Sequence, residues 1–190
     1  MSTTDIPPAT KPREGLGGGD STASGFQPPE AVVGGRVALT FGLYGTPIPQ
    51  GSHRSYVVGN RAVTTDDNEN TKPYRAEVTH AALITKRLSV AADEILLPSG
   101  AVAVVAIFYM PRPQGHYGTG RNAGQLRPSA PRWPTTKKAD TDKLGRLIGD
   151  ALTAAGVWRD DCQVIHWQMT KLYATGTPSA HITVYDLEGS

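Results

Sequence analysis

Cysteine is nearly absent from this 190-residue sequence, because Cys162 is the only one. A single thiol excludes an internal disulfide bond and any zinc site built from several cysteines. No Cys–His arrangement surrounds it, so we expect a partly buried thiol and not a nucleophile. The five histidines also lack metal-ligand spacing. We expect no organic cofactor.

Long apolar runs are missing as well. The longest, residues 101–110, is far too short to cross a bilayer. No apolar stretch follows Met1 as it would in a signal peptide. We therefore expect a soluble, cytoplasmic protein with no membrane partner.

Large apolar side chains are scarce in residues 1–30, where Pro, Gly, Ser and Thr fill 17 of the 30 positions. Such a segment buries too little surface to offset its ordering entropy, so we expect a flexible N-terminal tail. Residues 31–190 are long enough for a single domain with a hydrophobic core.

The rest of the chain alternates between strand and helix patterns. Alternation predicts a half-buried strand at 36–45, with Val37, Leu39, Phe41 and Leu43 on its apolar side. Two β-prone runs around Gly59-Asn60 predict a hairpin. Helical spacing follows over residues 71–92 and sets Val78, Ala82 and Leu88 on one side.

A continuous apolar run at 101–110 predicts a central strand covered on both faces. A second helix begins near Asp142 and is expected to stop at Gly156. Two alternating segments, 163–173 and 180–187, then predict closing strands. This order predicts an α/β (α+β) domain with a mixed sheet and two main helices.

Acidic residues are entirely absent from residues 111–138, which hold six basic ones and show no periodicity. Connections of this length without regular structure tend to be functional or disordered. We expect a basic loop that binds phosphate groups; the alternative is a solvated, disordered loop. The candidate phosphate-binding residues, including one from the helix that follows, are Arg112, His116, Arg121, Arg127, Lys137, Lys138 and Lys143.

Five aspartates surround the second helix. At about 100° per residue, Asp142 and Arg146 share the face opposite the apolar one. Asp140, two residues earlier in extended chain, points the same way as Asp142. Asp161, in the turn before the next strand, can join them. Simpler interpretations stay open: Asp142 as an N-cap, Arg146 as a solvated side chain, the Asp160-Asp161 pair as a solvated turn, and Asp150 as a structural carboxylate.

Three carboxylates within about 5 Å would repel by roughly 3 kcal/mol per pair at an effective dielectric near 20. A bound cation would offset that repulsion, and all-oxygen ligands select a hard ion such as Mg²⁺, with Mn²⁺ as the alternative. A metal site beside a basic loop is suited to the chemistry of phosphate esters. We therefore predict Asp140, Asp142 and Asp161 as metal ligands.

The pattern D-x-D-K-L-x-R-x-x-x-D-A-L at 140–152, followed by W-x-D-D-x-Q-V at 158–164, resembles the RusA family of Holliday junction resolvases, including its phage-type members. The resemblance implies a homodimeric, Mg²⁺-dependent endonuclease that nicks four-way DNA junctions symmetrically, so the basic residues above are predicted to bind DNA. It implies catalytic roles for Asp140, Asp142, Asp161 and Arg146, and we expect Asp150 and Asp160 to be accessory residues. Arg146 stands where the family usually has lysine, which changes reach and hydration. Ala139 stands where the family often has proline.

Three functions remain in competition. The lead is a nuclease that resolves four-way DNA junctions by paired nicks. The second is a less selective metal-dependent nuclease that acts on flaps or forks. The third is a junction-binding module without catalysis, in which the aspartates are structural.

Overall fold

The computed structural model describes residues 35–51, 53–66, 69–91, 98–135 and 139–188. The tail predicted at residues 1–30 lies outside the described residues.

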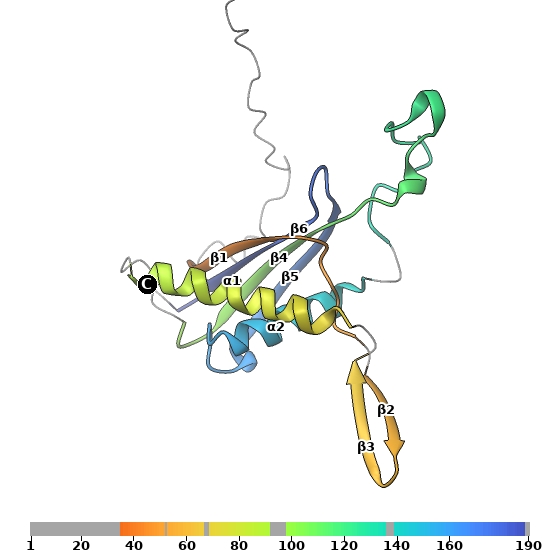
Figure 1. Ribbon diagram of the computed structural model, residues 1–190. Coiled ribbons are helices and arrows are strands. Elements are labelled where there is room, and N and C mark those ends of the chain that lie inside the picture. Colours follow the sequence, from red (N-terminus) through yellow and green to blue (C-terminus); the bar gives the residue numbers. More distant parts are fainter. Residues whose placement is uncertain (1–34, 52, 67–68, 92–97, 136–138, 189–190) are drawn as a thin grey trace, which may run out of the picture.

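A four-stranded mixed sheet forms the centre of the described chain (Figure 1), in the order β1-β6-β4-β5. The first two neighbour pairs are antiparallel and β4 pairs with β5 in parallel. The expected mixed sheet is thus confirmed. Its strands are β1 (Arg36–Tyr44), β4 (Val102–Met110), β5 (Val164–Tyr173) and β6 (Ser179–Asp186).

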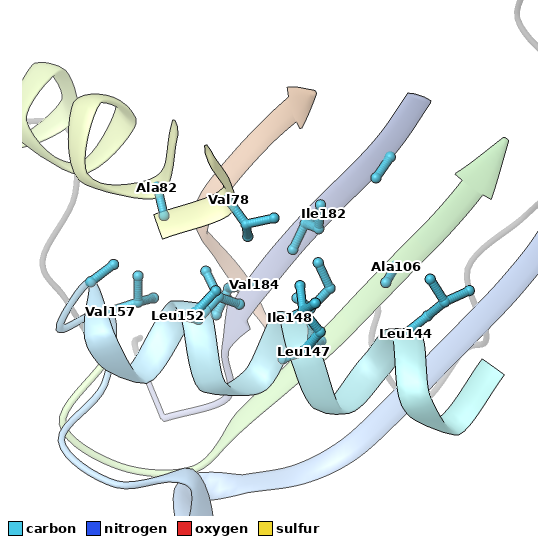
Figure 2. Packing of buried hydrophobic residues seen from close by; sticks show 14 of the residues in the cluster. Val78, Ala82, Ala106, Leu144, Leu147, Ile148, Leu152, Val157, Ile182 and Val184 are labelled. Carbon is cyan, nitrogen blue, oxygen red and sulfur yellow. The ribbon is translucent and has the colours of Figure 1, made fainter. Parts of the chain in front are cut away.

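Two helices, α1 (Thr71–Ala91) and α2 (Thr141–Ala154), cover one face of this sheet (Figure 1). Figure 2 shows apolar side chains of α2 packed towards those of β4, β6 and α1. Burying each such side chain contributes roughly 1.5–3 kcal/mol, so this layer fixes α2 against the sheet. The fully buried side chains of α2 include Leu144, Leu147, Ile148 and Leu152.

The C-terminus of α2 is tied to α1. Gly156 has a left-handed φ of 62° and its N–H donates to Thr153, which confirms it as the helix stop. Lys86 of α1 donates to the carbonyls of Ala155 and Gly156 at 3.3 and 2.8 Å. These bonds satisfy carbonyl groups that a helix end leaves without intrahelical partners.

Two apolar residues are more exposed than their spacing predicts. Val37 is 43% exposed because a β-bulge between Val37 and Leu39 shifts the alternation of β1. Leu88 is 67% exposed. Lys86 contacts the residues just after the C-terminus of α2. Leu88 lies further along α1, past the end of α2, so α2 does not cover it.

Two segments project from the helix–sheet body (Figure 1). One is the predicted hairpin, formed by β2 (His53–Val58) and β3 (Arg61–Asp66). The other is the basic loop, described over residues 111–135. It contains two short 3₁₀ helices, Gln114–His116 and Gly120–Asn122, and its tip folds back on itself through the Tyr117–Leu126 bridge. The prediction that this loop lacks regular structure was therefore wrong.

Candidate active site

The N-terminus of α2 carries the first two candidate aspartates. Asp140 is the N-cap, in extended backbone, and its side chain makes no capping hydrogen bond. Its carboxylate instead lies 3.7 Å from the Lys143 ammonium. Asp142 is already inside the first turn, so it is not the N-cap. The two aspartates were expected to point the same way because they are two residues apart in extended chain. The extended chain ends at Asp140, so that argument does not apply to Asp142.

Asp142 pairs with Arg146 one turn further along α2. Their side chains lie 3.4 Å apart and are 65% and 64% exposed. This confirms the prediction that both residues share the face opposite the core. An exposed pair at this helical spacing is worth only about 0.3–0.5 kcal/mol, so either partner can separate from the other at little cost.

The Asp160–Gln163 turn is held by a capping box. Asp160 accepts a hydrogen bond from the Cys162 N–H at 2.9 Å, while the Gln163 side chain accepts from the Asp160 N–H at 3.2 Å. The amide of Gln163 also donates to Gly100 just before β4. The bond from the Cys162 backbone lowers the pKa of the Asp160 carboxyl. Asp160 thus shapes the turn that presents Asp161.

Cys162 is exposed, and not partly buried as expected, because this turn lies at the surface. Its hydrogen bond with Asp160, followed by smaller effects, raises the pKa of the thiol. A thiol with a raised pKa is a poor nucleophile at neutral pH, in line with the prediction that Cys162 does not act as one.

A cavity of about 300 Å³ brings four of the predicted residues together. Asp142, Arg146 and Asp150 line it from α2, and Asp161 lines it from the turn before β5. Asp140 is not among its lining residues. The remaining lining residues are Gly145, Gly149, Trp167 and Met169.

Two glycines of α2 allow β5 to come this close. A Cβ on Gly145 would collide with the sulfur of Met169, and one on Gly149 would lie 3.5 Å from the Trp167 ring. The close approach of α2 to β5 brings the two acidic segments to one cavity. The helical spacing of these glycines, four residues apart, is the sequence signal for such a contact.

Asp150 has structural partners as well as a place in the cavity. It lies 3.4 Å from the Arg75 guanidinium of α1 and accepts a hydrogen bond from Gln50 at 3.2 Å. The backbone N–H of Gln50 in turn donates to the carbonyl of Lys143. Asp150 therefore joins α1, α2 and the segment after β1, as its structural interpretation predicted.

The donors in the cavity fit a hard divalent ion in part. Within the described ranges, no group of three or more His, Cys, Asp or Glu residues is close enough to hold a metal. Asp142 and Asp161 nevertheless line one cavity, and Mg²⁺ commonly binds through one or two carboxylates and keeps several waters. Of the three metal ligands predicted from the sequence, the structure therefore brings two, Asp142 and Asp161, to one cavity. Asp140 does not line it.

The basic residues of the loop differ in what they contact. Arg112 donates to the Pro131 carbonyl, and Arg127 donates to the Tyr117 carbonyl, so both help to shape the loop. His116 packs edge-to-face against Tyr173. Arg121 is exposed in the second 3₁₀ helix. Lys137 and Lys138, also predicted to bind DNA, lie outside the described residues.

Sequence reasoning missed two supporting residues. Gln163 completes the capping box, for which the spacing of Asp160 and Gln163 is the sequence signal. Lys171 of β5 donates to the Ala139 carbonyl at 2.6 Å and so fixes the chain just before Asp140. No sequence pattern marks that contact, because it joins residues 32 positions apart.

The cavity along α2 therefore defines a carboxylate-lined site with one arginine, built from two segments of the chain. The chain belongs to the RusA family, since the family model described as "Endodeoxyribonuclease RusA" matches residues 45–185.

Curated proteins called crossover junction endodeoxyribonuclease RusA share part of this sequence. Those of Escherichia coli strain K12 and Shigella sonnei strain Ss046 are each 33% identical over 54 residues. The protein of that name from Enterobacteria phage 82 has the same identity over the same length. Each match covers 28% of this chain and 45% of the relative, so it spans less than half the length of those relatives. Among the helices that the structure describes, none is long and apolar enough to cross a membrane.

Proposed function

We propose that this protein is a divalent-metal-dependent endodeoxyribonuclease that resolves four-way DNA junctions through phosphodiester hydrolysis. The observation that carries the proposal is the cavity shared by Asp142, Arg146 and Asp161, within the region that matches the RusA family. The names of the curated relatives support the choice of substrate.

Asp142 and Asp161 would hold the metal ion, with Asp140 contributing from the N-cap. When bound, a divalent ion supplies a more acidic water and positive charge that offsets the charge on the reacting phosphate. Mg²⁺ suits an all-carboxylate site, and Mn²⁺ can occupy the same oxygen ligands.

Arg146 would act on the phosphate. Its side chain lines the cavity, is 64% exposed and, among the described residues, forms an exposed pair with Asp142. A phosphate oxygen offers a stronger, charge-assisted partner for the guanidinium. Arg146 would therefore turn from Asp142 to the substrate and leave the Asp142 carboxylate to the metal.

The basic loop would position the DNA. It leaves the sheet at the end of β4 and the chain then continues to Asp140 at the start of α2, so a strand held by the loop would be directed towards that end of the helix. Arg121 and the other exposed cations of the loop would contact phosphates, which give affinity without base specificity.

Two-fold symmetry of a four-way junction requires two active sites for paired nicks, so we propose a homodimer as the active form. The two edge strands of the sheet, β1 and β5, are the candidates for its interface, and they lie at opposite edges. The two strands therefore cannot contribute to a single interface. In an isologous dimer, either β1 would pack against β1 of the second subunit or β5 against β5. Light scattering at micromolar concentration, with and without DNA, tests this; a monomer in both conditions would contradict it.

The deciding experiment incubates the protein with end-labelled four-way junction, flap, fork and linear duplex, with and without Mg²⁺ or Mn²⁺. We expect paired symmetric nicks in the junction only when metal is present. Scattered cuts in flaps and forks would instead establish the less selective nuclease. Tight junction binding without any cut would establish the binding module and overturn the nuclease. Asp142→Asn protein, purified in the same way, controls for contaminating nuclease.

A further inference from the structure

A second and larger cavity, of about 710 Å³, lies at the base of the basic loop. It is formed where β4 and β5 end, by residues of the 174–177 turn, the end of β1 and both arms of the loop. Its volume falls within the range of small-molecule sites. The side chains that give it its character are Tyr44, Tyr109, Arg112, Arg132, Trp133 and Tyr173.

Flat stacking surfaces dominate this cavity. The Arg112 guanidinium carbon lies 3.9 Å from the centre of the Tyr173 ring, and that of Arg132 lies 4.8 Å from the Trp133 ring. Tyr44 and Trp133 are 85% and 51% exposed. Aromatic side chains of this size are normally largely buried, so two exposed ones beside one cavity indicate a binding surface.

The charge of the cavity restricts its ligand. Its described lining includes two guanidinium groups and no Asp or Glu. A cationic ligand would be repelled, although aromatic rings alone would accept one. A ligand that has both an aromatic ring and a negative charge fits, and nucleotides have both.

Strand β5 connects the cavity to the candidate active site, although Tyr109, Leu172 and His181, which also line the cavity, alternate with the residues packed on α1 and α2 and so lie on the opposite face of the sheet. Along β5, Met169 lines the acidic cavity, Lys171 holds the chain before Asp140, and Tyr173 lines the aromatic cavity. These residues alternate, so their side chains are on one face of the strand. Met169 and Tyr173 are four residues apart, roughly 13 Å, which is about four base-pair steps of DNA.

We propose that this aromatic cavity accepts an unpaired base of a DNA strand, stacked on Trp133 and Tyr44, with the adjoining phosphate on Arg112 or Arg132. The choice of DNA as the ligand rests on the proposed function. The stacking surfaces contact the face that every base shares, so the cavity selects for an unpaired base and not for a sequence. It would hold a base extruded near the branch point.

The test compares two single strands of equal length in the presence of a chelator: an oligothymidylate and a chain of abasic sugar phosphates. Both carry the same phosphates, and only one has bases. We expect wild-type protein to bind the oligothymidylate about 5- to 100-fold more tightly. Trp133→Ala should lose most of that preference, while Trp133→Phe should keep part of it.

Leu126→Ala is the matched control, because Leu126 is a 52% exposed apolar residue of the same loop and does not line the cavity. It should bind both strands as wild type does. Equal binding of the two strands by wild type, or an unchanged preference in Trp133→Ala, would overturn the proposal. If free thymidine monophosphate binds as tightly as the oligothymidylate, the ligand is a free nucleotide and not a DNA strand, which would overturn the proposal.

Junction cleavage is measured in parallel with Mg²⁺ to separate the two proposals. If the protein prefers bases over abasic sugars but never nicks a junction, the aromatic site is supported and the nuclease proposal is overturned. If it nicks junctions without any base preference, the nuclease is supported and the aromatic site is overturned.

Discussion

Replacing Asp142 with asparagine should abolish cleavage and leave the fold and DNA binding intact. Asparagine has the same shape as aspartate but lacks the charge that a divalent ion requires. It also removes a negative group from the surface that is proposed to face DNA phosphates. We expect cleavage to fall at least about 100-fold, because a catalytic metal supplies several kcal/mol of transition-state stabilisation. Junction affinity should be unchanged or higher.

The structure limits the cost of this substitution to the fold. Asp142 is 65% exposed and its one described ion pair, with Arg146, is worth about 0.3–0.5 kcal/mol. Its place in the first turn of α2 adds about 0.3–1 kcal/mol through the helix dipole. A total near 1 kcal/mol would lower the Tm by about 2–4 °C in a chain of this size.

Thermal unfolding with and without Mg²⁺ provides a readout besides activity. At a metal concentration about 100-fold above Kd, wild type gains about 2.7 kcal/mol, which corresponds to roughly 5–11 °C. Asp142→Asn should show little of that gain. Glu77→Gln, which removes an exposed carboxylate of α1, should behave as wild type. Full cleavage by Asp142→Asn would refute the catalytic assignment, and a Tm loss above about 10 °C would show that Asp142 is structural.

The remaining predictions concern the loop, the acidic turn and a buried tyrosine. Arg121→Ala should flatten the slope of log affinity against log salt by about 0.9, as expected for one lost phosphate contact, and an unchanged slope would remove Arg121 from the DNA surface. Arg127 is unsuitable for this test because its guanidinium holds the Tyr117 carbonyl. Asp160→Ala should reduce cleavage by loosening the turn before β5, while Asp160→Asn, which keeps an acceptor for the Cys162 N–H, should restore most of it; equal activity of the two variants would contradict a capping role. Burial, followed by the charge of Glu77, raises the pKa of Tyr74 well above its ordinary value, and its buried hydroxyl has no hydrogen-bond partner among the described residues. Because the unfolded chain loses this proton near pH 10 and the folded chain keeps it, stability should fall as the pH rises above about 10. Tyr74→Phe should weaken that fall and raise the Tm by about 2–4 °C at neutral pH, as differential scanning calorimetry can measure.

The order of helices and strands was predictable because each follows a local rule. Period-two and helical apolar spacing marked the sheet and both helices, and Gly156 marked the end of α2. Local rules could not predict the exposure of Val37, since the bulge that turns it outward depends on the pairing of β1 with β6. The exposure of Leu88 likewise depends on where α2 ends in space.

The candidate site was predictable only where it follows from helix geometry. The shared face of Asp142 and Arg146 needed no tertiary information, and it is confirmed. The position of Asp161 in the same cavity depends on the close packing of α2 against β5, which a spacing argument can only suggest. Asp140 differs from expectation because its backbone belongs to the N-cap, from which its carboxylate reaches Lys143.

The two ends of the basic loop are fastened to β5 and to the residue that directly follows it. Ala174 donates to the Met110 carbonyl where the loop departs, and Lys171 donates to the Ala139 carbonyl where it returns. Lys171 lies in β5 and Ala174 follows its last residue, so these anchor points are three residues apart, or roughly 10 Å. Because loop-closure entropy changes slowly with length, the tip of the loop between these anchors can change in length at little cost to the packing of α2 on the sheet. The loop tip and the carboxylate cavity are therefore free to vary independently of each other.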